Sequence, residues 1–169
     1  MNRNFNKDWR KSIIVLSGGF DPVHKGHLRM FREASNLGHQ VIVGLNSDNW
    51  LTRKKGKPFM NFEERKEILE SFKYVNQVIP FDDSDNTASD LIKRVHSLYS
   101  GREYEHEYTD LNHTGMVDYY QIYFANGGDR RKDNVPEVDV CKDLGVIMLW
   151  GMGGGKIQSS SDLIKKSGR

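Results

Sequence analysis

Residues 12–27 read SIIVLSGGFDPVHKGH, and this stretch decides the fold of the 169-residue chain. Its first part, Ser12–Ser17, is a short apolar run that ends at two glycines, as expected of a strand buried on both faces of a parallel sheet. From Gly26 to Leu37 the apolar residues recur at helical spacing. A buried strand, a glycine-containing turn and a helix in this order predict the first unit of an alternating α/β domain.

The same alternation continues along the rest of the chain. Asn61 and Glu64 predict an N-cap with its reciprocal partner, and Gly38 stands where a helix end favours a residue with positive φ. Further strands are expected at 40–45, 75–80, 120–125 and 145–150, and further helices at 61–73, 90–99 and from about 160. The pattern predicts a Rossmann-like, doubly wound, five-stranded parallel sheet with helices on both faces. One ligand site is expected where four loops meet at the carboxyl edge of this sheet, after Ser17, Leu45, Ala125 and Trp150.

The composition is that of one folded domain spanning residues 1–169, with 37% hydrophobic and 28% charged residues. No apolar run is long enough to cross a bilayer, and the N-terminal segment lacks a signal-peptide pattern, so a cytoplasmic location without membrane contact is expected. The net charge of +2 is too small to predict nucleic-acid binding. Cys141 is the one cysteine in the sequence, which excludes an internal disulfide and favours a small buried helix residue.

Residues 101–119, GREYEHEYTDLNHTGMVDY, break the alternation because they are polar and aromatic with no clear period. They predict an insertion, either a surface loop or an interface element. Its acidic and histidine side chains follow no known metal-ligand spacing, which favours a solvated segment over a metal site. Four tyrosines in or beside the insertion either line a homodimer interface or fold back on the sheet: Tyr104, Tyr108, Tyr119 and Tyr120.

The turn between the first strand and the first helix carries the strongest chemical signal. Gly18 and Gly19 let a nucleotide approach the backbone closely. His24 and His27 lie at the mouth of the helix, where backbone N–H groups without intrahelical partners favour an anion. Imidazoles there donate hydrogen bonds and, when protonated, add positive charge. The spacing therefore favours a phosphate site over a zinc site, which usually needs three or four protein ligands.

Five segments of the chain then match, in order, the pattern of one superfamily. They are GGFDPVHKGH at 18–27, NSD at 46–48, RKKGK at 53–57, GGDR at 127–130 and QSSSDLI at 158–164. Between about residues 13 and 166 the chain resembles the HxGH nucleotidyltransferases, and it looks most like the glycerol-3-phosphate cytidylyltransferases and the heptose-1-phosphate adenylyltransferases. The resemblance implies that an acceptor's phosphate oxygen attacks the α-phosphorus of a nucleoside triphosphate and that pyrophosphate leaves.

The resemblance also implies roles for single residues. His24 and His27 would contact the triphosphate in the transition state, within a substrate-binding turn that includes Gly18, Gly19, Phe20 and Asp21. Such catalysis works by positioning the reactants and neutralising charge. Three serines at the start of the final helix would hold the β- and γ-phosphates, with Ser160 as the catalytic one beside Ser159 and Ser161. One of the three is alternatively a simple N-cap.

The basic run after the second strand has two interpretations. It is either a solvated charged loop or a phosphate-binding flap in which Lys55, with Lys57 as the neighbouring choice, lies over the α-phosphate. Arg65 either faces the acceptor's phosphate, as the resemblance implies, or is an exposed helix arginine paired with a glutamate of its own helix.

The GGDR segment would cup the base and ribose of the nucleotide. By resemblance, Gly128 contributes backbone groups, Asp129 bonds a ribose hydroxyl or only holds the turn, and Arg130 is a further substrate contact. A Mg²⁺ ion is expected with the triphosphate, without a dedicated protein cage. Residues 151–156, GMGGGK, fail the Walker A and dinucleotide-binding patterns, so a flexible loop that lets Lys156 reach the nucleotide is expected instead.

The sequence leaves three classes of function to compare. The first is an enzyme that transfers CMP from CTP to a phosphorylated sugar or polyol, or AMP from ATP to a sugar 1-phosphate. The second is a regulatory protein that binds a nucleotide without turnover, and the third is a nucleic-acid-binding module that uses residues 53–57. The intact histidine pair, Lys55 and Ser160 favour the enzyme, and CTP is the slightly favoured nucleotide.

Overall fold

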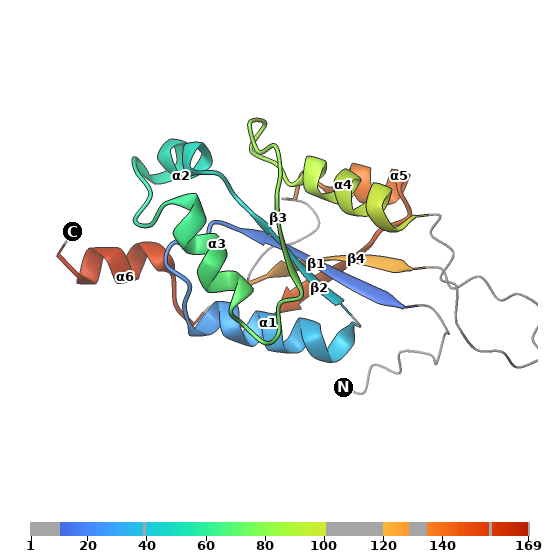
Figure 1. The fold of residues 1–169 in the computed structure, drawn as a ribbon, viewed down its shortest axis with the longest axis horizontal. Coiled ribbons are helices and arrows are strands. Elements are labelled where there is room, and N and C mark those ends of the chain that lie inside the picture. The colour runs from blue at the N-terminus through green and yellow to red at the C-terminus, as the bar shows by residue number, and fades with distance from the viewer. Residues whose placement is uncertain (1–10, 39, 101–119, 129–134, 156, 169) are drawn as a thin grey trace, which may run out of the picture.

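The computed structural model describes residues 11–38, 40–100, 120–128, 135–155 and 157–168. The chain alternates strands and helices in these parts (Figure 1). The strands are β1 (Ser12–Gly18), β2 (Gln40–Leu45), β3 (Gln77–Pro80), β4 (Gln121–Gly127) and β5 (Ile147–Met152). The helices are α1 (Lys25–Leu37), α2 (Asp48–Lys55), α3 (Phe62–Glu70), α4 (Ser89–Tyr99), α5 (Val138–Asp143) and α6 (Ser160–Lys166).

The five strands form one parallel sheet in the order β3-β2-β1-β4-β5. In the centre, β1 pairs with β2 in the register Ile14 to Val41 and with β4 in the register Ile14 to Tyr123. The chain leaves β1 toward β2 on one side and leaves β4 toward β5 on the other. The switch point of the doubly wound sheet, where ligands bind in such folds, therefore lies between β1 and β4.

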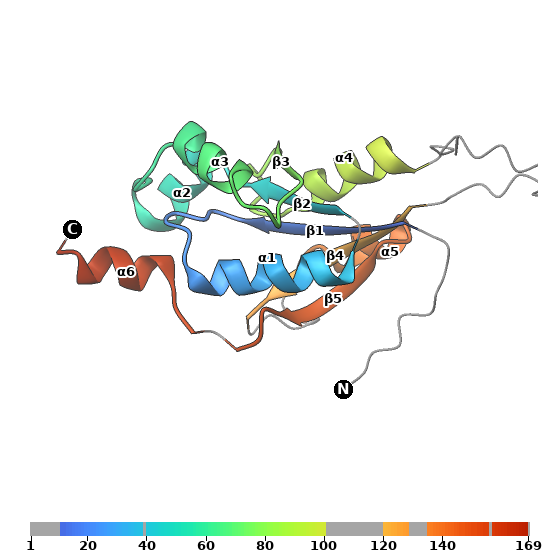
Figure 2. The same ribbon diagram turned by 60° about the horizontal axis from the view of Figure 1, so that its bottom comes forward.

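Helices cover both faces of the sheet, and each face has its own core (Figure 2). Because side chains alternate along a strand, Ile14 and Leu16 of β1 pack beneath α1 and α3 with Phe31 and Leu69. The neighbouring residues of β1 face the other way, into a cluster with side chains of α4 and α5: Ile13, Val15, Leu91, Ile92, Phe124 and Cys141. The predicted doubly wound sheet with helices on both faces is confirmed.

Several local expectations are corrected by the structure. Gly38 has a φ of −129° and not a positive φ. A Cβ at that position would lie 2.5 Å from Cγ1 of Ile14, so close packing against β1 explains the glycine. Residues 48–55 form α2, a helix that the sequence reading placed in a loop. Ser47 caps this helix, but Leu51 is its one buried residue, so an apolar stripe that would predict it is missing.

Two other local predictions are confirmed. Asn61 and Glu64 form the predicted capping box of α3, and Cys141 is buried on α5. None of the helices in the described ranges is long and apolar enough to span a bilayer. The predicted insertion at 101–119 lies outside the described residues, together with Tyr104, Tyr108 and Tyr119.

Candidate functional site

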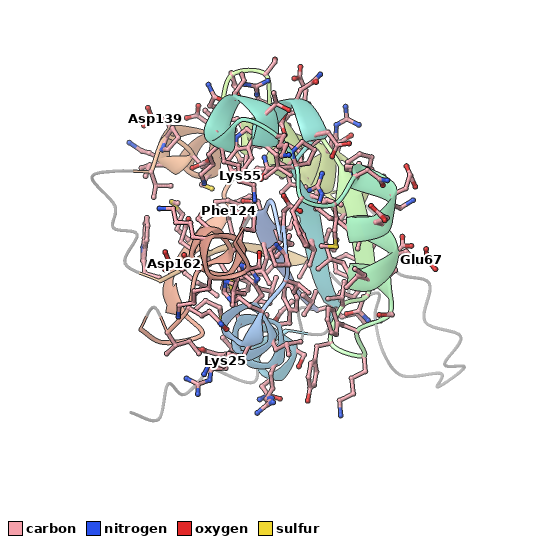
Figure 3. The ribbon with its side chains drawn as sticks, turned by 90° about the vertical axis from the view of Figure 1, so that its left-hand side faces the viewer. Lys25, Lys55, Glu67, Phe124, Asp139 and Asp162 are labelled. Carbon is pink, nitrogen blue, oxygen red and sulfur yellow. The ribbon has the colours of Figure 1, made fainter. Side chains whose placement is uncertain are left out.

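A pocket of about 630 Å³ opens at the carboxyl edge of the sheet, at the switch point. This volume is within the range usual for small-molecule sites. Its walls come from the ends of β1, β2, β4 and β5, from the first turns of α1 and α6, and from α2. Figure 3 looks onto this edge and shows Lys55 of α2 and Asp162 of α6 on different sides of it. The expected meeting point of four loops is thus a real cavity.

The two histidines of the motif cap α1 with their rings. His24 Nδ1 accepts a hydrogen bond from the backbone N–H of Gly26 at 3.1 Å, and His27 Nδ1 accepts from the backbone N–H of His24 at 3.2 Å. The rings stack with their centroids 3.8 Å apart. A ring nitrogen that accepts carries no proton, so each neutral imidazole keeps its hydrogen on Nε2. Both rings line the pocket and present donors to a ligand.

Burial keeps this histidine pair neutral. Desolvation, with a smaller contribution from the neighbouring His24, lowers the pKa of His27 to about 3. Desolvation also lowers the pKa of His24, against a smaller opposing effect of its backbone hydrogen bond. The expectation that protonated imidazoles add charge at physiological pH is therefore wrong for His27. The rings also accept the backbone N–H groups of Gly26 in the helix and of the cap residue His24, so the ring donors left for a ligand are the Nε2–H groups.

Asp21 is fully buried and holds the segment between α2 and α3. Its carboxylate accepts from the backbone N–H groups of Phe59 and Met60, each at 2.7 Å, and pairs with Lys55 Nζ at 2.9 Å. Lys55 Nζ also donates to the Asp21 carbonyl at 2.6 Å. Both residues lie in the pocket wall as predicted, but they are bonded to each other. Contact of either one with a substrate stays a prediction.

Arg65 is buried among loops that shape the pocket. Its side chain has no exposed surface, so the alternative of an exposed helix arginine is wrong. The guanidinium donates to the carbonyls of Gly19 (2.8 Å), Asn46 (2.9 Å) and Met60 (3.1 Å) and to Asp48 Oδ1 (2.6 Å). Arg65 is not in the pocket wall. The geometry therefore gives it a positioning role, and the predicted contact with the acceptor's phosphate stays untested.

Asp83, three residues after the end of β3, bonds to the NSD segment at the end of β2. Its carboxylate accepts from Ser47 N (2.7 Å), Ser47 Oγ (2.7 Å) and Asn46 Nδ2 (3.0 Å). Arg53 donates to the Asp83 carbonyl at 2.7 Å. Asp83 itself is 4% exposed. Sequence reasoning missed this residue because a single aspartate in an acidic loop follows no motif.

Most of the basic run belongs to α2 and not to a loop. Arg53, Lys54 and Lys55 occupy the last turn of that helix, where cations interact favourably with the helix dipole. Gly56 ends the helix with a φ of 92°. Lys57 is exposed and outside the pocket wall. The expected loop is therefore a helix, and of the two candidate lysines the structure places Lys55 at the pocket. Its contact with the α-phosphate stays a prediction.

The serines of the final helix all line the pocket but differ in their bonds. Ser159 is the N-cap of α6, accepting from the backbone N–H of Asp162 at 3.1 Å, as one alternative expected. Ser160 Oγ donates to the Pro22 carbonyl at 2.7 Å and so ties α6 to the histidine loop. Ser161 is exposed at the pocket surface. Their contact with phosphates remains a prediction.

The wall between β4 and β5 is made largely of glycine backbone. Gly127, Gly128 and Gly153–Gly155 line the pocket. A Cβ at Gly153 would lie 3.1 Å from the backbone of Met30, which shows how closely this loop approaches α1. Asp129, Arg130 and Lys156 lie outside the described residues. A glycine-lined slot suits a flat ring that is recognised through backbone groups.

Sequence reasoning missed Trp50 and Asn126, two of the residues in the pocket wall. Trp50 of α2 lies in the wall with Lys54, whose Nζ is 4.3 Å from the Trp50 ring centroid. Asn126, the residue before the glycines of β4, is buried in the wall. The position of Asn126 at the end of a predicted strand was a signal that could have revealed it, because such positions face the ligand in doubly wound folds.

These features together define a class of protein. Neutral donors at a strand-to-helix turn, a glycine-lined slot and a basic helix end meet at the switch point of a parallel sheet. Such a site can hold a nucleotide and stabilise charge on its phosphates without a covalent intermediate. The fold and site therefore define a nucleotide-binding α/β protein of the group-transfer type.

Comparison with known proteins gives the family. The sequence profile of the cytidylyltransferase-like family matches residues 15–139, and the chain belongs to this family of nucleotidyltransferases. A glycerol-3-phosphate cytidylyltransferase of Bacillus spizizenii is 29% identical over 132 residues, which cover 78% of this chain and 95% of that protein.

One further relative and one solved structure were also compared with the chain. The bifunctional protein HldE of Sulfurimonas denitrificans is 37% identical over 103 residues, which cover 59% of this chain and 21% of HldE. The chain thus corresponds to about a fifth of that protein. A lipopolysaccharide core biosynthesis protein of Thermoplasma volcanium shares the fold with a TM-score of 0.57, at 17% identity over 83% of this chain and 94% of that one.

Proposed function

We propose that the chain transfers CMP from CTP to a phosphorylated sugar or polyol and releases pyrophosphate. An oxygen of the acceptor's phosphate attacks the α-phosphorus and forms a new P–O bond. The bond from the α-phosphorus to the bridging oxygen breaks, and that oxygen leaves with the pyrophosphate. Atoms and charge balance without a redox partner or a covalent enzyme intermediate.

The observation that carries this proposal is the histidine pair. His24 and His27 are fixed by backbone hydrogen bonds and by stacking, with Nε2–H donors at the pocket. Donors fixed before the reaction need little reorganisation when negative charge grows on the phosphate oxygens. Because both rings are neutral, they stabilise this charge by hydrogen bonding and not as general acids.

The choice of CTP follows from the relatives. The glycerol-3-phosphate cytidylyltransferase matches along 95% of its own length, whereas HldE matches over a fifth of its length at a higher identity. Agreement along a whole protein supports CTP and a polyol phosphate. ATP with a sugar 1-phosphate is the second candidate, supported by the 37% identity with HldE.

We further propose that the triphosphate enters as its Mg²⁺ complex and that the protein acts in the cytoplasm as a homodimer. No cluster of three or more His, Cys, Asp or Glu side chains stands ready for a metal within the described parts of the chain. In this proposal the ion is part of the substrate, held by phosphates and water. Light scattering measures the mass in solution, and a monomer would contradict the dimer.

Pyrophosphate release tests the proposed function. The purified chain is incubated with each nucleoside triphosphate, Mg²⁺, and either glycerol 3-phosphate or a panel of sugar 1-phosphates. The proposal expects turnover with CTP and one acceptor. Turnover with ATP alone supports the second candidate. Nucleotide binding without turnover under any of these conditions supports the non-catalytic regulatory protein and contradicts the enzyme.

A further inference from the structure

Two buried asparagines lie at the carboxyl ends of β2 and β4, the strands on either side of β1, and their surroundings differ. Asn46 follows β2, is 6% exposed, and donates from Nδ2 to Asp83 Oδ2 at 3.0 Å. Asn126 lies near the end of β4 and is 3% exposed. Its Nδ2 has no hydrogen-bond partner in the described part of the chain. A buried amide donor without a partner is costly, so Asn126 requires an explanation that Asn46 does not.

The side chain of Asn126 faces the α4 side of the sheet. Phe124, two residues earlier on β4, packs in the cluster under α4 and α5. Gly127, one residue later, faces α1, because a Cβ there would lie 2.8 Å from Sδ of Met30. The register of the β4–β5 pairing shifts between Ala125 and Gly127, but the extra residue of this bulge belongs to β5. Side chains along β4 therefore continue to alternate between the two faces of the sheet.

Asn126 nevertheless lines the nucleotide pocket, together with Ser17 of β1 and Asn46. The histidine donors approach the same pocket from α1, on the other side of the sheet. The pocket therefore has two polar sides, with the paired imidazoles on one and the Asn126 amide on the other. None of the predicted motif contacts places a substrate group against the Asn126 side.

The geometry of phosphoryl transfer indicates which substrate contacts the Asn126 side. In an in-line displacement, the attacking oxygen and the leaving group lie on opposite sides of the phosphorus. The inference rests on the proposed function, with the leaving pyrophosphate placed against the histidines and the serines of α6, and in that arrangement the acceptor approaches from the α4 side. We infer that the amide of Asn126 donates a hydrogen bond to the acceptor's phosphoryl group and helps to select phosphorylated acceptors.

The chemistry of the amide suits this role. An asparagine NH₂ group offers two hydrogens and no charge, so it recognises phosphoryl oxygen without holding the product tightly. The torsion about Cβ–Cγ is broad and two-fold. A turn about that bond presents the buried Nδ2 to the pocket that the side chain already lines. The unpartnered donor of the free protein is then satisfied in the complex.

Three variants test the inference: Asn126→Ala, Asn126→Asp and the matched control Asn46→Ala. With saturating nucleotide, Asn126→Ala is expected to raise the KM for the acceptor by about 10- to 100-fold, the usual effect of losing a hydrogen bond to a charged group. Asn126→Asp is expected to raise it further, because a carboxylate repels the phosphoryl group. The KM for the nucleotide is expected to change by less than about threefold in both.

Melting temperature and calorimetry separate this inference from the proposed function. Asn126→Ala loses no hydrogen bond and is expected to melt close to the parent, whereas Asn46→Ala deprives Asp83 of a donor and is expected to melt lower. Titration with glycerol 3-phosphate and with inorganic phosphate is expected to show weaker binding to Asn126→Ala without any need for turnover. If the parent shows no turnover but this difference persists, the proposed function fails and the inference stands.

Each of three outcomes would overturn the inference. The first is that the parent and Asn126→Ala bind each phosphate probe equally well, or that neither protein binds either probe. The second is a rise in the KM for the nucleotide with an unchanged KM for the acceptor, which would place the amide against the nucleotide. The third is a melting temperature of Asn126→Ala as low as that of Asn46→Ala, which would show that the amide already has a partner in the free protein.

Discussion

The histidine wall and the α2 wall of the pocket are both polar, but they use their polar groups differently. On the histidine wall, neutral rings bond to the backbone through Nδ1 and keep Nε2–H for a ligand. On the α2 wall, the charges bond to one another: Lys55 with Asp21, and Arg65 with Asp48 behind the pocket surface. Two of the motif cations thus hold the pocket in shape, while the neutral rings keep donors for a ligand.

This difference teaches how to divide the motif residues by role. A residue whose donors are already used by the protein is expected to affect stability and positioning when it is replaced. A residue with an unused donor at the pocket is expected to affect turnover with little change in stability. The following substitutions are designed to break or sharpen this division.

The largest effect is expected from the histidines. His24→Ala and His27→Ala are each expected to lower kcat by about 10²–10³, the usual loss when one preorganised donor to a developing oxyanion is removed. Pyrophosphate release at saturating substrates measures this. The helix cap is lost as well, which costs about 0.5–2 kcal/mol of stability.

His27→Asn separates the donor from the cap. The asparagine Oδ1 can accept the backbone N–H of His24 as Nδ1 does now, but its side chain is too short to replace Nε2–H. This variant is expected to melt above His27→Ala and to be as inactive. If His27→Asn kept the parent kcat, the Nε2 donor would have no role in turnover.

The next effect concerns the stability of the α2 wall. Arg65→Ala removes a buried guanidinium with four hydrogen bonds to protein oxygens. The free energy of unfolding is expected to fall by about 3–5 kcal/mol, because three carbonyls lose their donor and a cavity replaces a fully buried side chain. Arg53→Ala is the matched control, because Arg53 is 41% exposed although it bonds to Asp83. A loss within about 1 kcal/mol is expected there. Equal losses in denaturant unfolding would contradict the division.

The sequence predicted the fold where apolar patterns are strong. The buried run of β1 and the capping pair of α3 were sufficient to place these elements, because burial and capping are local signals. The helix α2 was missed because its contact with the core is Leu51 alone. The positive φ predicted for Gly38 was wrong, because the glycine is explained by close packing against Ile14. That contact joins two elements distant in sequence, so no local pattern predicts it.

The site was predictable in position but less so in detail. The motif placed the histidines at the pocket, but their neutrality depends on burial and on hydrogen bonds between ring and backbone. The interior position of Arg65 and the contacts of Asp83 arise from loops that meet only in the folded chain. Asn126 carries no motif, and its unpartnered amide becomes visible only when its neighbours are known.

A smaller effect distinguishes the two candidate lysines. Lys55→Ala removes the ion pair with buried Asp21 and frees the segment that Asp21 holds. A fall in kcat/KM of about tenfold is expected, which corresponds to about 1.4 kcal/mol of transition-state stabilisation. Lys57→Ala, at an exposed position outside the wall, is expected to stay within about twofold of the parent. A larger loss for Lys57→Ala in steady-state kinetics would indicate that Lys57, and not Lys55, contacts the phosphate.

The last effect is a pH dependence of stability that comes from the buried imidazole. The folded protein lowers the pKa of His27 to about 3, from an ordinary value of 6.5. Between these two values the unfolded chain binds a proton that the folded chain does not, so the stability contributed by neutral His27 is present above pH 6.5 and is lost as the pH falls toward 3. One group contributes a slope of at most about 1.4 kcal/mol per pH unit. His27→Asn lacks this group but keeps the cap, so its free energy of unfolding is expected to fall less than that of the parent between pH 7 and pH 4.5. Equal acid sensitivity of the two proteins would show that the ring on the histidine wall is not held neutral, and the contrast with the charged α2 wall would then disappear.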